Sequence, residues 1–154
     1  MTETTILKKK TYIEMIKNSV GTRMFQHLYA VVDGEEKDIV DGGDLSCALF
    51  VSSILHQFDL INSPHATVSG LIRDLENYGW QKTDEPVAGA VIIWEPATQA
   101  GGEMHEHAGF SIGDGEAVSN SYSERVPVCH PINKTNGDGS MRQTTAIYMH
   151  PAFT

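Results

Sequence analysis

One helix constrains the fold of this chain more than any other segment. Between residues 45 and 58, apolar side chains occur on almost every side of the predicted helix, and Asp44 or Ser46 stands where a cap is needed. A helix that is apolar all round is buried, so other elements must cover it. We therefore expect a central helix whose surface is formed by Leu45, Ala48, Leu49, Val51, Ser52, Ile54, Leu55 and Phe58.

Helical spacing also occurs on both sides of this segment, and strand patterns follow. Residues 11–19 are helical in pattern before Gly21, and another helix runs from Thr67, its expected cap, to Gly79. Asp114-Gly115 is a hairpin turn signal. The expected strands are 90–94, 107–112, 116–121, 126–132 and 144–149. This order predicts an α+β fold, with the helices packed on one face of an antiparallel sheet of about five strands.

Length and charge narrow the class of protein. The 154 residues suit one domain, 1–154, because no linker, repeat or low-complexity tract divides them. A net charge of −9 disfavours a nucleic-acid partner, because phosphates require a basic face. No apolar run reaches the ~20 residues of a membrane helix, so we expect no membrane partner.

The first residues and the cysteines predict the compartment. The start of the chain lacks the apolar stretch of a secretory signal peptide. Cys47 and Cys129 do not form a disulfide framework, so free thiols in a reduced environment are expected. We therefore expect a chain that is cytoplasmic as synthesised, with any release or export by an unconventional or phage-type route.

Cys47 is the candidate nucleophile. It follows the glycine-containing approach 41–44 and stands at the start of the predicted central helix. A cysteine attacks as its thiolate, and the N–H groups and dipole of a helix start favour an anion. The same N–H groups can stabilise an oxyanion. The alternative is a small buried residue on an apolar helix, which is how free cysteines commonly occur.

His107 is the candidate base among seven histidines, because it opens a predicted strand that can present it to the helix start. His105, two residues earlier, would point to the same side of an extended chain. This spacing permits a second interpretation, in which both histidines hold a metal with Glu103, Cys129 or His130. A lone His-x-His pair is weak support for a metal site, and we expect neither metal nor cofactor.

Two blocks of sequence resemble a known family. Residues 44–51, Asp-Leu-Ser-Cys-Ala-Leu-Phe-Val, resemble the Asp-Cys-Ser-Gly-Leu-Val block of NlpC-type cell-wall cysteine peptidases. Residues 86–94 resemble the strand before the catalytic histidine, and 107–113 resemble the His-Val-Gly-Ile-Tyr-Ile-Gly strand that carries it. The resemblance covers roughly residues 42–121. It implies the papain-like fold that these peptidases share with the related CHAP amidases and peptidases.

The resemblance also implies a third polar residue on the strand after the histidine. Counting along the hairpin places Ser119 at that position, with Asn120 beside it. An asparagine can accept a hydrogen bond from the imidazole and fix its tautomer, so we favour Asn120 and keep Ser119 as the alternative. Asp44, Ser46 and His105 flank these residues and are the expected substrate contacts.

The expected function is that of a cysteine peptidase or amidase, a thiol hydrolase that cleaves amide bonds by acyl transfer. The resemblance implies peptides of peptidoglycan as the substrate, cut by an endopeptidase or amidase. Two other functions remain open. One is a non-catalytic binding domain on the same fold, in which Cys47 would be unreactive and fully buried. The other is a metal-binding protein that uses His105 and His107.

Overall fold

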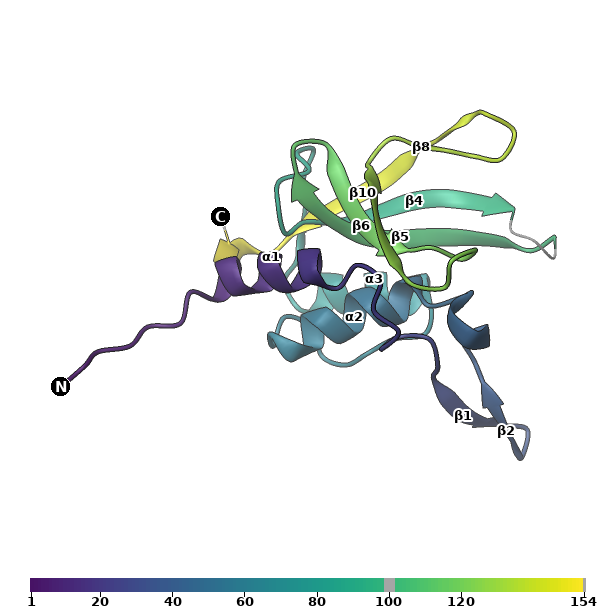
Figure 1. The fold of residues 1–154 in the computed structure, drawn as a ribbon, viewed down its shortest axis with the longest axis horizontal. Coiled ribbons are helices and arrows are strands. Elements are labelled where there is room, and N and C mark those ends of the chain that lie inside the picture. Colours follow the sequence, from purple (N-terminus) through teal and green to yellow (C-terminus); the bar gives the residue numbers. More distant parts are fainter. Residues whose placement is uncertain (99–101, 154) are drawn as a thin grey trace.

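Three α-helices lie against one face of an antiparallel sheet in the computed structural model, which describes residues 1–98 and 102–153 (Figure 1). The helices are α1 (Lys8–Asn18), α2 (Cys47–Gln57) and α3 (Val68–Asn77). A 3-10 helix, η1 (Asp41–Gly43), precedes α2, and another, η2 (Pro151–Phe153), follows the last strand. The expected Thr67 cap is confirmed, because its hydroxyl accepts the N–H of Gly70 at 3.1 Å.

The sheet has six strands in the order β3-β10-β4-β5-β6-β7, and every neighbouring pair is antiparallel. Its strands are β3 (Gln81–Lys82), β4 (Val91–Thr98), β5 (Met104–Gly113), β6 (Glu116–Asn120), β7 (Pro127–Pro131) and β10 (Thr144–Met149). The predicted α+β class, with helices packed on an antiparallel sheet, is confirmed. The strand that the sequence does not predict is β3, whose two residues are too few to show an alternation.

Two short hairpins stand outside this sheet. They are β1 (Tyr29–Val32) with β2 (Glu35–Asp38), and β8 (Lys134–Thr135) with β9 (Met141–Arg142). Neither hairpin is among the strands predicted from the sequence. Most side chains of the first hairpin are exposed on both faces, so no alternation of apolar and polar residues marks it.

The turn between β5 and β6 sets the register of the candidate site. Asp114 and Gly115 have φ values of 55° and 76°, as a two-residue type I′ turn requires, so the predicted hairpin is confirmed. The pairing that follows places Gly109 opposite Ser119. A Cβ atom on Gly109 would lie 2.7 Å from the Ser119 Cβ, so only glycine fits here.

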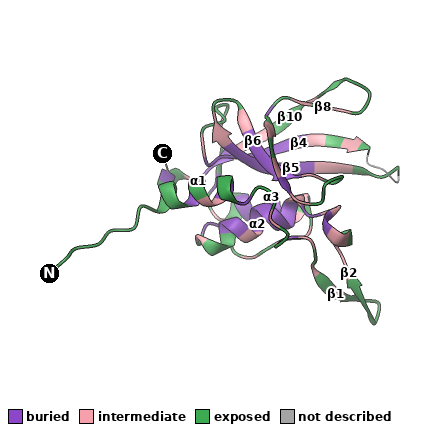
Figure 2. Ribbon diagram, viewed as in Figure 1, coloured by how far each residue is buried: buried purple, intermediate pink, exposed green. Residues whose placement is uncertain are grey.

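The main core lies between the helices and the sheet (Figure 2). The predicted central helix is confirmed, because α2 is buried along most of its length. Its Phe50 meets Phe110 of β5 edge-on, with ring centroids 5.4 Å apart, and Tyr12 of α1 meets the same ring at 5.8 Å. A smaller cluster on the other face of the sheet consists of Ile92, Trp94, Ala117 and Ile132. In the described part of the chain, no helix has the length and apolarity needed to cross a membrane.

Candidate active site

Helix α2 presents Cys47 as its first residue, where the N–H groups of the first turn have no carbonyl partner within the helix. Cys47 is partly exposed and lines a cavity of about 450 Å³, which His107 of β5 also lines. The backbone N–H of Ala108, the residue after His107, favours the thiolate form of Cys47. The helix start and the strand thus bring the predicted nucleophile and the predicted base to one cavity.

The loop before α2 is held by close backbone contacts. Gly43 has a φ of 100°, and a Cβ atom on it would lie 2.7 Å from the Arg125 carbonyl oxygen, so glycine is required there. The Asp38 carboxylate accepts the backbone N–H groups of Val40 and Gly42 at 3.2 and 2.9 Å. These donors, with others at the same carboxylate, lower its pKa despite partial desolvation. The loop is therefore anchored by an ionised carboxylate.

A chain of contacts runs from the His107 ring through Ser119 and His130 to the carbonyl group of Pro131. Its Nε2 lies 2.8 Å from the Ser119 Oγ, and that oxygen lies 2.6 Å from the His130 Nε2. The His130 Nδ1 lies 2.8 Å from the carbonyl oxygen of Pro131. His107 and Ser119 are buried, and His130 is half-buried.

The contacts of Ser119 and Pro131 favour one nitrogen of each ring as the carrier of the proton. A carbonyl oxygen only accepts, so the Nδ1 of His130 must donate to Pro131, which leaves its Nε2 as an acceptor in the neutral ring. The Ser119 hydroxyl then donates to His130 and accepts from the His107 Nε2. This arrangement leaves the His107 Nδ1 unprotonated and able to accept a proton from a thiol. The Lys134 ammonium, 3.3 Å from the same Nε2, can only donate and therefore opposes this tautomer.

Burial keeps both predicted partners neutral at rest. The pKa of His107 is well below its ordinary value, because the ring is desolvated and because Lys134, Arg142 and His130 oppose a further positive charge. The pKa of Cys47 is raised by desolvation, although the N–H groups of Ala108 and Ala48 and the same two cations favour the thiolate. The sequence-based expectation of a lowered Cys47 pKa is therefore wrong. Desolvation raises the pKa of the thiol by more than the helix start lowers it.

Asn120 occupies a different place from the one expected. It is buried, and its Nδ2 donates to the carbonyl oxygen of Gly43 at 2.8 Å rather than contacting His107. Successive residues of a strand point to opposite faces, so Ser119 and Asn120 cannot both face the histidine. Among the described residues Ser119, the alternative, holds the position next to the ring. Asn120 instead joins β6 to the loop before α2 and lines the cavity from that side.

The three expected substrate contacts are placed differently. Asp44 and His105 line the Cys47 cavity. Ser46 is fully buried and, in the part of the chain that the structure describes, its hydroxyl has no hydrogen-bond partner. The expected side-chain cap on α2 is not formed, because Ser46 has φ −96° and ψ 6° instead of the extended conformation of a usual N-cap.

The histidine pair does not form a metal site. Within residues 1–98 and 102–153, no group of three or more His, Cys, Asp or Glu side chains is placed to hold a metal ion. The His105 Nε2 lies 3.2 Å from the Glu103 carboxylate, whereas His107 turns to Ser119. Cys47 and Cys129 are both free thiols.

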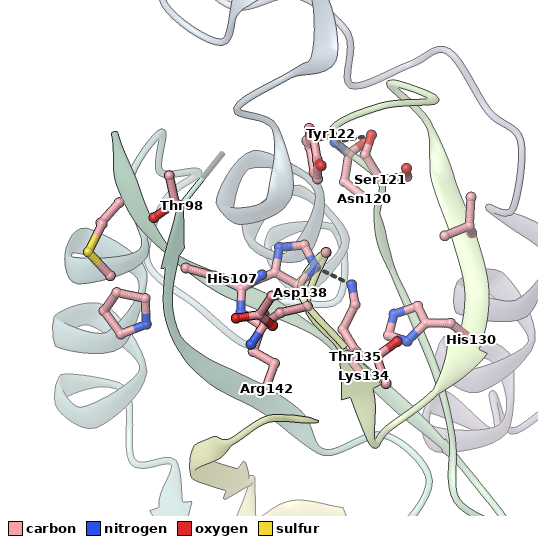
Figure 3. Close-up of a pocket in the computed structure, with 16 residues that line it drawn as sticks. Thr98, His107, Asn120, Ser121, Tyr122, His130, Lys134, Thr135, Asp138 and Arg142 are labelled. Carbon is pink, nitrogen blue, oxygen red and sulfur yellow. Dashed lines mark hydrogen bonds between the residues drawn. The ribbon is translucent and has the colours of Figure 1, made fainter. Parts of the chain in front are cut away.

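Trp94 and Lys134 were not predicted as site residues from the sequence, and His130 was considered only as a metal ligand. The indole of Trp94 packs against the rings of His107 and His130, at centroid distances of 5.3 and 5.6 Å. Lys134 of β8 places its ammonium 3.3 Å from the His107 Nε2 (Figure 3). The predicted strand through His130 was a usable signal, because its pairing with β6 places that ring near Ser119. Lys134 lies between two predicted strands, where no such signal points to it.

Comparisons of the chain with models of protein families and with curated proteins find no match. The resemblance to NlpC-type peptidases therefore depends on the sequence blocks around Cys47 and His107.

Proposed function

We propose that this protein is a cysteine hydrolase that cleaves an amide bond by acyl transfer. The observation that carries the proposal is the shared cavity of Cys47 and His107, together with the Ser119 and His130 hydrogen bonds, which favour the His107 tautomer with an unprotonated Nδ1. A nucleophile needs a base with a free lone pair, and this base needs an orienting partner. Ser119 is that partner in the proposal, and His130 orients Ser119.

The proposed reaction starts from a neutral thiol and a neutral imidazole. The Cys47 sulfur attacks the amide carbonyl carbon as its proton moves to the His107 Nδ1. The oxyanion that results lies near the free N–H groups at the start of α2, beginning with that of Cys47. His107 then gives its proton to the leaving amine, and water releases the acyl group from sulfur and restores the thiol. While His107 is an imidazolium, its Nε2–H donates a hydrogen bond to the Ser119 hydroxyl.

The proposed substrate is a peptide of peptidoglycan. This part rests on the resemblance to NlpC-type peptidases, whereas the thiol chemistry rests on the site itself. The chemistry can act on any amide that reaches the cavity, because a fold does not determine its substrate.

The test is mass analysis of purified peptidoglycan peptides after incubation with the full chain. The account predicts fragments whose summed mass exceeds that of the parent peptide by one water. They should form with the wild type and with the control Cys129→Ala, and be absent with Cys47→Ala. Fragments that persist in Cys47→Ala would refute the role of the thiol. Intact peptides throughout would refute the substrate, and the same assay on unrelated peptides would then test the chemistry.

A further inference from the structure

A second cavity, of about 570 Å³, adjoins the first and is lined by several charged or titratable side chains (Figure 3). These are His107, His130, Lys134, Asp138 and Arg142. The two cavities share His107 and Asn120 among their lining residues, so they meet at the proposed base. A substrate bound across Cys47 would therefore extend into the second cavity.

The two cations of this cavity, Lys134 and Arg142, have no carboxylate within ion-pair distance among the described residues. The Glu95 carboxylate favours the charged form of Arg142 from farther away. Lys134 is half-buried, and its ammonium lies 3.3 Å from the His107 Nε2 and 5.5 Å from the centroid of the Trp94 ring. Arg142 donates to two backbone carbonyl oxygens, those of Glu95 and His105, at 2.8 and 2.7 Å. A carbonyl oxygen satisfies a guanidinium donor but does not neutralise its charge.

Among the described residues that line the cavity, the one acidic side chain is directed elsewhere. The Asp138 carboxylate accepts the backbone N–H and the hydroxyl of Ser140, at 2.9 and 2.6 Å, within its own loop. The chain as a whole has 20 acidic and 11 basic residues. In so acidic a chain, two cations without an ion-pair partner in one cavity create a local positive potential. An anionic group of a ligand would neutralise it.

Burial disfavours the charged forms of both Lys134 and Arg142. Desolvation and the neighbouring Arg142 lower the pKa of Lys134 to about 8, and desolvation also lowers the pKa of Arg142. Both cations favour the thiolate of Cys47 as well, which means that they act on the same reaction centre. An anion between them would offset the desolvation of both.

We propose that the cavity bordered by Lys134 and Arg142 is a subsite for a carboxylate of the substrate, beside the bond that Cys47 attacks. The proposal rests on the proposed function for its link to catalysis. The preferred substrates are then amides that carry a free carboxylate close to the scissile bond, and the neutral analogue of each should react more slowly.

The first test compares two alkylating reagents that react in the same way and differ in charge. Iodoacetate and iodoacetamide each form an S–CH₂ bond with Cys47 and release iodide. We expect the ratio of the iodoacetate rate to the iodoacetamide rate at Cys47 to exceed that of 2-mercaptoethanol by about 10- to 100-fold, the range that local fields produce. Lys134→Met should reduce this ratio, Lys134→Arg should preserve it, and the control Lys82→Met on β3 should leave it unchanged.

A second test does not depend on the reactivity of Cys47. In Cys47→Ala, we expect N-acetylglycine to shift the imidazole NMR signals of His107 and His130 saturably. N-acetylglycinamide, the neutral analogue, should not do so, and Lys134→Met should abolish the effect. Equal responses to the two compounds, or no response, would overturn the carboxylate subsite. A wild-type protein that shows no preference for iodoacetate but is alkylated normally by iodoacetamide would overturn it too and leave the proposed function intact. Failure of the proposed function would instead appear as unselective alkylation of both cysteines.

Discussion

The two faces of the sheet are used in opposite ways. The face toward the helices is packed with aromatic and aliphatic side chains such as Phe110 and Ile93, which are fully buried. The other face carries only a small apolar cluster around Trp94, and beside it lie His107, Ser119 and His130. The strands β4, β5 and β6 contribute to both. Alternation along one strand thus separates stability from the proposed chemistry by a single residue.

This contrast predicts which changes damage which property. Substitutions on the helix face should change the free energy of unfolding and leave the reactivity of Cys47 intact. Substitutions on the histidine face should do the reverse. Cys47 is the exception, because the helix layer supplies it to the cavity that the histidine face borders.

The largest effect is expected for Cys47→Ala, which should abolish hydrolysis. No neighbouring hydroxyl can replace the thiol, since that of Ser46 is buried away from the cavity. The measurement is the rate of product formation, with Cys129→Ala as the matched control. An equal loss of hydrolysis in Cys47→Ala and Cys129→Ala would contradict the contrast between the two faces, because the exposed Cys129 thiol on β7 would then matter as much as Cys47.

His107→Gln should reduce hydrolysis by about 10²–10⁴-fold, the usual contribution of general acid–base catalysis. Glutamine retains a polar side chain but cannot shuttle a proton. The Cys47→Ala/His107→Gln double variant should resemble Cys47→Ala alone, because members of one catalytic unit are not additive. Thermal unfolding of His107→Gln would check that the fold is retained. Wild-type rates in this variant would remove the base from the mechanism.

Ser119→Ala should be milder, at or below the lower end of that range, about 10²-fold, because an orienting group does not itself transfer the proton. The informative readout is the tautomer of His107, measured by ¹⁵N NMR. Wild type should carry its proton on Nε2, and Ser119→Ala should show a mixture of both tautomers. Asn120→Ala is the comparison on the opposite face and should leave the tautomer unchanged. A tautomer that responds to Asn120 and not to Ser119 would reverse the assignment.

The smallest effect is expected for Ile93→Val on the helix face. Removing one buried methylene should lower the free energy of unfolding by about 0.5–1.5 kcal/mol, measured by urea denaturation. The alkylation rate of Cys47 should not change. A changed rate at an unaltered fold would show that the two faces are coupled more closely than the packing indicates.

Much of the fold could be predicted because local signals agree with it. The apolar surface of α2, the Thr67 cap and the Asp114-Gly115 turn each correspond to an observed element. The exposed hairpin of β1 and β2 could not be predicted, because neither of its faces is buried. Local pattern is informative only where burial imposes a period.

The site was less predictable, because its contacts depend on strand register. The choice between Ser119 and Asn120 required the pairing of Ser119 with Gly109, and the strand pattern alone allows a shift of one residue. His130 enters through its pairing opposite Ala117, and Lys134 enters through a hairpin with no apolar pattern. The pKa of Cys47 was mispredicted because the helix start is visible in the sequence and the depth of burial is not.

The most direct test of the account is the pH dependence of iodoacetamide alkylation at each cysteine, measured by peptide mass analysis. The pKa of His107 is lowered and that of Cys47 is raised, both by desolvation, so over the pH range between them both groups are neutral, and transfer of the thiol proton to His107 during attack makes the rate independent of pH. We predict a plateau in the Cys47 rate across this range, lost in His107→Gln, while the Cys129 rate rises about tenfold per pH unit below its own pKa. A wild-type Cys47 rate that rises in parallel with that of Cys129 would contradict the account.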